Sequence, residues 1–385
     1  MDRRHNWLAL ALLWAAGNGL RLPVLALAPV IPLIQADLNL SGTQIGVLSG
    51  LPVLLFGLAA IPGSLLIARF GALAAVVIGL LLAGAAGSLR GAIPQIAWLY
   101  AMTILMGAGI AFMQPAMTAL VRAWTPHRIG FATAIYTNGL LVGETLPVAL
   151  TIPFVLPLLD NSWRATFVFW GLPMFGIAAL MLLAPANKDA GAAAPRRWWP
   201  DWRSSVIWRL GLILSSVNGA YFSANAFIPS YLTEAGRADL VSPVLTALNL
   251  VQLPASFLLL AVAHRLERRA WPFVVTGLIL LICIVGIAST ASIWTIVFAA
   301  VLGFTGAIIL SLALTLPAIL SAPEDVARTS AAMFTVSYVT AMLFSVLCGI
   351  AWDIGGSPRW AFLPIIVGIL PQILLIGTIR FPRST

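Results

Sequence analysis

Charged residues are scarce in this sequence: Asp, Glu, Lys and Arg make up 9% of the 385 residues, whereas hydrophobic residues make up 61%. A typical soluble domain carries about 25% charged residues. So little charge could not cover the water-exposed surface of a soluble protein of this length, but a surface that faces lipid needs none. We therefore expect an all-α polytopic membrane protein that has membrane lipid as a partner.

Cysteine and histidine are also rare, with two and three residues. Cys283 and Cys348 lie in different apolar stretches, where we expect buried thiols rather than a disulfide or a metal pair. The sequence has no phosphate-binding loop, zinc-ligand spacing or nucleophile motif. We expect no cofactor, no metal and no enzymatic activity. The net charge of +9 follows from membrane topology, so we expect no nucleic-acid partner.

Apolar stretches of about 20 residues or more, the length that crosses a bilayer, alternate with polar, Gly or Pro breaks. The first is too long for a signal peptide and is expected to be retained. Six stretches precede a polar segment and six follow it. We expect one bundle over residues 1–186, a cytoplasmic linker over 187–203 and a second bundle over 204–385. The expected spans are 7–35, 44–68, 72–89, 95–121, 129–158, 163–184, 205–233, 241–263, 271–289, 291–320, 327–352 and 359–379.

The basic residues follow this topology. With the N-terminus inside, sixteen of the 21 fall in cytoplasmic segments or at the cytoplasmic ends of spans, and the one left over, Arg21, lies near the middle of a span. This bias is the positive-inside rule and predicts that both termini are cytoplasmic. The basic residues expected outside are Arg90, Arg164, Arg237 and Arg359.

The two halves repeat each other at a separation of about 200 residues. "NGLRLPVLALAP" begins at Asn18 and "NGAYFSANAFIP" at Asn218, with the same spacing from Asn-Gly to Pro. "GLP" at 50–52 matches "QLP" at 252–254. The repeat predicts a duplicated six-helix unit with a central cavity between its halves, as in rocker-switch transporters.

This plan resembles the major facilitator superfamily, and several motifs resemble its cyanate and 2-nitroimidazole permease branch. The resemblance implies twelve transmembrane helices in two pseudo-symmetric bundles and alternating access for a small polar or anionic organic solute. It also implies a monomer in the bacterial inner membrane, with import favoured over export. The resembling stretches are "GLRLPVLALAPVIPLI" (19–34), "IARFG" (67–71), "SLRGAIPQ" (88–95), "GAGIAFMQPAM" (107–117) and "VNGAYFSANAFIPSYL" (217–232).

Two ionisable residues, Arg21 and Glu144, are expected at similar depth near the middle of their spans. Arg21 either binds an anionic or polar solute or is paired with Glu144 only to join two helices. An Arg at this place is part of the branch pattern. Glu144 either carries the coupling proton, or is a static counter-ion of Arg21, or is a protonated acid bonded to Asn138 or Thr145. Burial favours a protonated carboxyl group and a nearby Arg favours the ionised one, so solute binding at Arg21 could switch between them.

Other polar residues could line the solute site. Asn18 shares a helix face with Arg21, and Tyr221 takes the place of Arg21 in the second repeat. For each amide the alternative is an interhelical hydrogen bond. The candidates are Asn18, Tyr221, Asn218, Asn225, Gln114 and Gln252, with Tyr136, Asn138, Asn249 and Tyr338 as weaker ones.

Another function remains open at this point, namely proton-driven efflux of amphipathic drugs. The drug-antiporter pattern Gly-x-x-x-Gly-Pro is half present, because Gly139 and Gly143 are followed by Glu144. A sensor would usually add a soluble output domain and an enzyme a catalytic constellation. We find neither, so a transporter is favoured over both. Glu144 in place of the proline weakens the drug-efflux alternative, so a proton symporter is favoured.

The topology predicts the outcome of reporter fusions. A fluorescent protein that folds only in the cytoplasm should be bright when fused after residue 203 or at the C-terminus, and dark when fused after Arg164 or Arg237. Alkaline phosphatase, which is active only outside, should give the opposite pattern. The same reporter being active at both Arg164 and the C-terminus would contradict the expected topology.

Overall fold

The computed structural model describes residues 3–58, 60–184, 201–266, 269–321 and 325–379. It is 86% helix, and the described residues contain no β-strand. Contacts divide the chain into two compact units. Unit 1 comprises Met1–Asn39 and Leu58–Ala194, and unit 2 comprises Leu40–Gly57 and Pro195–Thr385. The linker predicted at 187–203 lies outside the described residues as far as residue 200.

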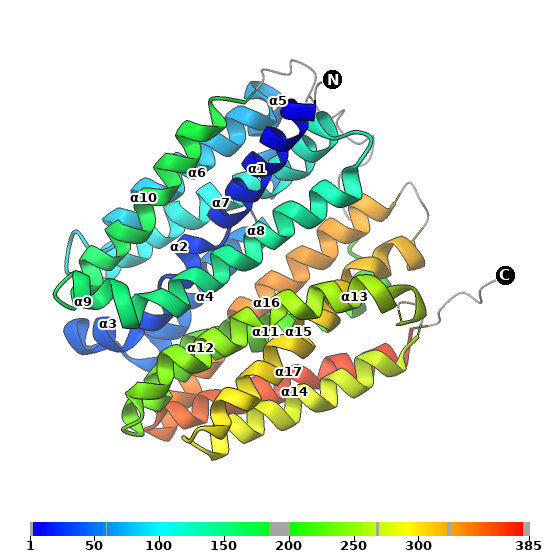
Figure 1. Cartoon of the computed structure of the whole chain (residues 1–385). Helices are drawn as coiled ribbons and strands as arrows, with labels where there is room; N and C mark the ends of the chain where they lie inside the picture. The colour runs from blue at the N-terminus through cyan, green and yellow to red at the C-terminus, as the bar shows by residue number, and fades with distance from the viewer. Residues whose placement is uncertain (1–2, 59, 185–200, 267–268, 322–324, 380–385) are drawn as a thin grey trace. The chain divides into compact units, whose positions relative to one another are not determined.

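The helices of unit 1 pack around α1, α6, α7 and α8. In this unit, α1 lies beside α8, and α6 packs against both α7 and α10 (Figure 1). Its helical segments are α1 (Arg3–Gly19), α2 (Leu22–Leu25), η1 (Ala28–Val30), α3 (Ile31–Leu38), α5 (Ala60–Phe70), α6 (Ala72–Leu89), α7 (Ile96–Trp124), α8 (Ile129–Leu150), η2 (Thr151–Val155), α9 (Leu156–Leu158) and α10 (Trp163–Met181).

Glycines let α6 and α7 approach closely. A Cβ on Gly109 would lie 2.7 Å from the Gly79 carbonyl oxygen, and one on Gly79 would lie 2.5 Å from that of Gly109. Neither distance leaves room for a methyl group. Lipid tails are as apolar as the side chains, so burying apolar surface between two helices gives no hydrophobic free energy. Close backbone packing of this kind is then a main source of helix association.

The other helices of unit 2 pack around α11, whose side chains are buried almost without interruption from residue 213 to residue 232. Its neighbours are α15, α16 and α17 (Figure 1). The helical segments are α4 (Gly42–Leu58), α11 (Ser205–Glu234), η3 (Ala238–Leu240), α12 (Val241–Leu250), α13 (Gln252–Leu266), α14 (Trp271–Ser289), α15 (Trp294–Leu320), α16 (Val326–Gly355), η4 (Pro358–Ala361) and α17 (Phe362–Ile376).

The grouping of residues 40–57 with unit 2 has a local cause. The Asp353 carboxylate, near the end of α16, accepts hydrogen bonds from the backbone N–H groups of Gly42 (2.6 Å) and Thr43 (2.9 Å). A carboxylate at the first turn of α4 satisfies donors that have no partner within the helix and complements the helix dipole. Farther along, the Ser345 hydroxyl donates to the Gly46 carbonyl oxygen.

Ten helical segments in the described residues are long and apolar enough to cross a membrane. Three coincide with predicted spans: 72–89, 129–158 and 271–289. The predicted span 205–233 is the continuous 30-residue helix α11, which is absent from these ten segments although its length suffices. The predicted span 44–68 is divided between α4 and α5, and α4 has 17 residues. The all-α membrane fold predicted from composition is confirmed.

The α6–α7 contact predicts a paired substitution experiment. Gly109→Ala should lower the apparent melting temperature in detergent by several degrees, because the new methyl group would collide with the Gly79 carbonyl. Gly176→Ala is the matched control, since a Cβ on this glycine in the interior of α10 meets nothing within 4 Å. Both changes gain about 0.8–1 kcal/mol of helix propensity. Equal shifts in the two variants would refute the packing role.

Candidate functional site

Span one is broken at the position of its charge. The segment is apolar from Trp7 to Leu38, but α1 ends at Gly19 and α2 begins at Leu22. Pro23 explains the break, because its ring would collide with the carbonyl of Gly19 in a continuous helix. The backbone at Arg21 therefore leaves the α conformation (φ −129°, ψ −28°). A single continuous helix over 7–35, implied by the span prediction, is thus corrected.

Glycines in α8 bring this broken segment close to the acidic residue. A Cβ on Gly139 would overlap the Trp14 carbonyl oxygen, and one on Gly143 would overlap that of Asn18. α8 can therefore lie against α1 with backbone in contact with backbone. Glu144 follows Gly143 directly, so the close approach also sets the distance from its carboxylate to Arg21.

Arg21 and Glu144 form an ion pair inside unit 1. Arg21 Nε lies 3.3 Å from Glu144 Oε1, and the two side chains are 11% and 5% exposed. Neighbouring polar groups are engaged elsewhere: the Thr145 hydroxyl donates to the Leu141 carbonyl, and Asn138 Oδ1 accepts from the Trp14 indole. The pairing of these residues, which the sequence left open, is present. It places a positive and a negative charge together in a low-dielectric interior.

Asn18, the predicted helper of Arg21, is buried one turn before it. Its carbonyl oxygen accepts from the Arg21 N–H (3.2 Å), and its side-chain amide donates to the Trp14 carbonyl (3.0 Å). Asn18 thus shapes the break in span one through its backbone.

A second polar cluster lies in unit 2. The Tyr221 hydroxyl donates to Asn249 Oδ1, and Asn249 Nδ2 donates to Asn225 Oδ1 (2.9 Å). Asn225 Nδ2 in turn donates to the Tyr221 carbonyl (3.0 Å). These side chains come from α11 and α12, so the predicted pair Tyr221 and Asn225 is brought together. Asn249, a weaker candidate in the sequence, is the residue that joins them.

The remaining candidates are placed separately. Asn218 donates from Nδ2 to the Ser337 hydroxyl of α16 (2.9 Å), which is the interhelical bond foreseen as the alternative for any one amide. Gln252 is buried at the first residue of α13, and Gln114 is half-buried on α7. Ser337 was not singled out by the sequence, because a serine in an apolar span carries no distinguishing pattern.

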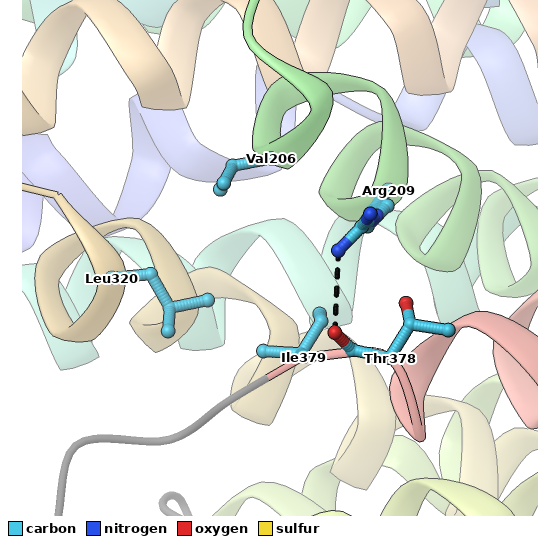
Figure 2. A pocket seen from close by; sticks show the side chains of 5 residues that line it. All are labelled: Val206, Arg209, Leu320, Thr378 and Ile379. Carbon is cyan, nitrogen blue, oxygen red and sulfur yellow. Dashed lines mark hydrogen bonds between the residues drawn. The ribbon is translucent and has the colours of Figure 1, made fainter.

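A cavity of about 480 Å³ lies away from these residues, at one end of unit 2. It is lined by Arg209, Leu320 and Thr378 together with Val206 and Ile379, and Arg209 donates to the Thr378 carbonyl (Figure 2). None of its lining residues was predicted as a site residue. Among the described residues, no three His, Cys, Asp or Glu side chains form a group that could hold a metal ion.

Comparison with known proteins places these features in context. The profile of the Major Facilitator Superfamily matches residues 12–345. The chain is 27% identical to the cyanate transport protein CynX of Escherichia coli, over 95% of this chain and 96% of that protein. It is 26% identical to the 2-nitroimidazole transporter of E. coli over 93% and 91% of the two chains. The crystal structure of the nucleoside transporter NupG superposes with a TM-score of 0.74 at 11% identity, over 98% of each chain.

The buried pair predicts an asymmetric stability pattern. Arg21→Met should destabilise the protein by about 3–5 kcal/mol, because it leaves Glu144 buried without its counter-charge. The double variant Arg21→Met, Glu144→Leu should recover most of the loss in melting temperature. As a control, Arg164→Met breaks the exposed pair with Asp37 (2.6 Å) and should cost about 0–1 kcal/mol. A double variant no more stable than the single one would contradict a paired Arg21.

Proposed function

The chain belongs to the Major Facilitator Superfamily and is a secondary transporter of small anionic or polar solutes, and we propose that Arg21 is the group that binds this solute. The observation that carries the proposal is the buried Arg21–Glu144 pair at the break in span one. A buried ion pair adds little net stability compared with apolar side chains of similar size. Binding of the solute by Arg21 would explain why a charged residue lies at the break in span one.

Arg21 suits a small monovalent anion. Its guanidinium is charged at every physiological pH and presents N–H donors in a planar fork that matches a carboxylate or similar anion. The break caused by Pro23 lets the Arg21 backbone depart from the helix. The relative that transports cyanate indicates the size of such an anion, and the 2-nitroimidazole transporter indicates a polar heterocycle.

We propose further that Glu144 carries the coupling proton. In the resting pair Glu144 neutralises Arg21. When an anion binds Arg21 it replaces that carboxylate, and the carboxylate then gains stability by taking up a proton. Anion binding and protonation of Glu144 therefore favour each other, and by linkage the effect is reciprocal. The result is co-transport of one proton with one anion, in the direction of import when the outside is acidic.

The polar residues of unit 2 are proposed as further solute contacts. Tyr221 and Asn225, held together by Asn249, offer hydroxyl and amide groups to a polar solute. Gln252 and Gln114 are proposed in the same role. Asn218 is also proposed as a solute contact. Its side-chain Oδ1 would make this contact, because its Nδ2 is hydrogen-bonded to Ser337.

The setting of the transporter is also proposed. The distribution of basic residues supports two cytoplasmic termini. The relatives from E. coli support a bacterial inner membrane. We propose a monomer that needs no partner other than the solute, protons and lipid, with the two bundles 1–186 and 204–385 as its moving parts and residues 187–203 as the connecting linker.

The mechanism predicts a pH dependence of binding. Thermal shifts of the purified protein with cyanate, formate and benzoate should grow as the pH falls from 8 to 5.5, because protonation of Glu144 releases Arg21. In Glu144→Gln the affinity for the same anion should be high and independent of pH. In Arg21→Met the shifts should be lost. Glu234→Gln, which removes an exposed carboxylate of α11, should leave the pH profile of the wild type unchanged.

Three outcomes would oppose the proposal. Wild type and Arg21→Met responding alike to the same anion would show that Arg21 is structural. An unchanged pH profile in Glu144→Gln would remove the proton role of Glu144. Stabilisation by tetraphenylphosphonium, a lipophilic cation, but by none of the anions would favour efflux of amphipathic drugs instead.

A further inference from the structure

A second arginine of unit 1, Arg90, is buried more deeply than Arg21. It follows the last residue of α6, and the topology expected from the sequence places it on the outer side of the membrane. Arg90 is 1% exposed and is among the largest fully buried side chains in the described residues. Burial lowers the pKa of its guanidinium to about 9, which leaves the group charged at neutral pH.

Arg90 contacts three separate parts of unit 1. Its Nε donates to the Gly87 carbonyl of α6 (3.2 Å), and its Nη2 donates to the Pro23 carbonyl of α2 (2.8 Å). The guanidinium lies 3.9 Å from the ring centroid of Phe167 on α10. Each contact is one that a planar, multi-donor cation makes well. Arg90 therefore ties α2 to the ends of two other helices.

These contacts do not fully compensate the buried positive charge of Arg90. None of the ion pairs between described residues includes Arg90, and its Nη1 is buried without a hydrogen-bond partner. A buried cation with an unsatisfied donor is a poor way to stabilise a helix bundle. The position of Arg90 suggests another role, because the Pro23 carbonyl that accepts its hydrogen bond is only two residues from Arg21.

Because span one is broken at Arg21, the short helix α2 needs contacts from other helices to fix its position. Between Gly19 and Leu22 the chain lacks continuous helical hydrogen bonding, and α2 is only four residues long. A segment this short is not stable by itself. α2 contacts α6, α8 and α10, so its position is set by packing and by the bond to Arg90. Any shift of α2 along this surface moves Arg21 relative to Glu144.

We propose that Arg90 is a positioning residue that holds the broken segment of span one and thereby sets the geometry of Arg21 for solute binding. The part of this inference that concerns the solute rests on the proposed function of Arg21. The part that concerns the segment itself does not, and it can be measured without any solute.

Hydrogen exchange provides the solute-free measurement. In Arg90→Met the backbone amides of residues 20–22 and 24–26 should exchange about tenfold faster than in wild type, because a hydrogen bond from a charged donor is lost. Arg90→Lys keeps the charge but not the fork, and should give an intermediate increase. Arg164→Met is the matched control. Arg164 lies near the same end of unit 1 and packs over Trp163 at 4.6 Å, but it bonds to Asp37 rather than to α2.

Binding provides the second measurement, with cyanate as the probe. Arg90→Met should weaken cyanate binding about tenfold, while Arg90→Met in the Arg21→Met background should cause no further loss. A purely structural role would instead lower the melting temperature without this non-additivity. Unchanged exchange at 20–26, or an equal increase in Arg164→Met, would overturn the proposal. Faster exchange with unchanged cyanate affinity would also overturn it.

The two proposals fail in different ways. If wild type binds neither cyanate nor the other anions, the proposed role of Arg21 fails. The exchange of residues 20–26 would then decide alone whether Arg90 holds the segment. Should Arg90→Met not yield folded protein, Arg90→Lys supplies both measurements.

Discussion

The constraint on which this structure depends is that a charge inside the membrane must be satisfied by the protein itself. Lipid offers Arg21 neither water nor counter-ions, so a carboxylate must be brought to within a few ångströms. Glu144 meets this need at 3.3 Å. The helix that carries it must then approach α1 closely, and Gly139 and Gly143 permit this. The pair, the glycines and the break at Pro23 form one interdependent arrangement.

The same constraint explains how binding and proton movement can be coupled. Removing either member of a buried pair leaves an uncompensated charge, which is costly. In the mechanism that we propose, a solute anion that takes the place of Glu144 at Arg21 avoids one cost, and a proton on Glu144 avoids the other. Each event then favours the other, which is what co-transport requires. The polar cluster of Tyr221, Asn225 and Asn249 contains no charge and involves no such exchange.

Much of the fold was predictable from particular stretches of sequence. Residues 72–89, 129–158 and 271–289 coincide with observed spans, because length and hydropathy alone determine whether a helix suits a bilayer. The break inside span one was missed, although Pro23 signalled it, because the apolar character continues across it. For the candidate site, Arg21 and Glu144 were found because intramembrane charge is rare. Asn249 was ranked low because an amide in a span carries no comparable signal.

The sequence by itself determined the class of protein, the number and order of apolar stretches, the repeat and the two charged residues near the middle of spans. These are properties of composition and of local pattern. Only the tertiary structure decided that Arg21 touches Glu144, that Asn218 is engaged with Ser337 and that Arg90 is buried rather than exposed. The partners of Arg90 that lie outside its own helix are the carbonyl of residue 23 and the ring of residue 167. Every residue has a backbone carbonyl, so the sequence does not show which carbonyl will accept a hydrogen bond. Contacts between distant segments form only once the helices have packed.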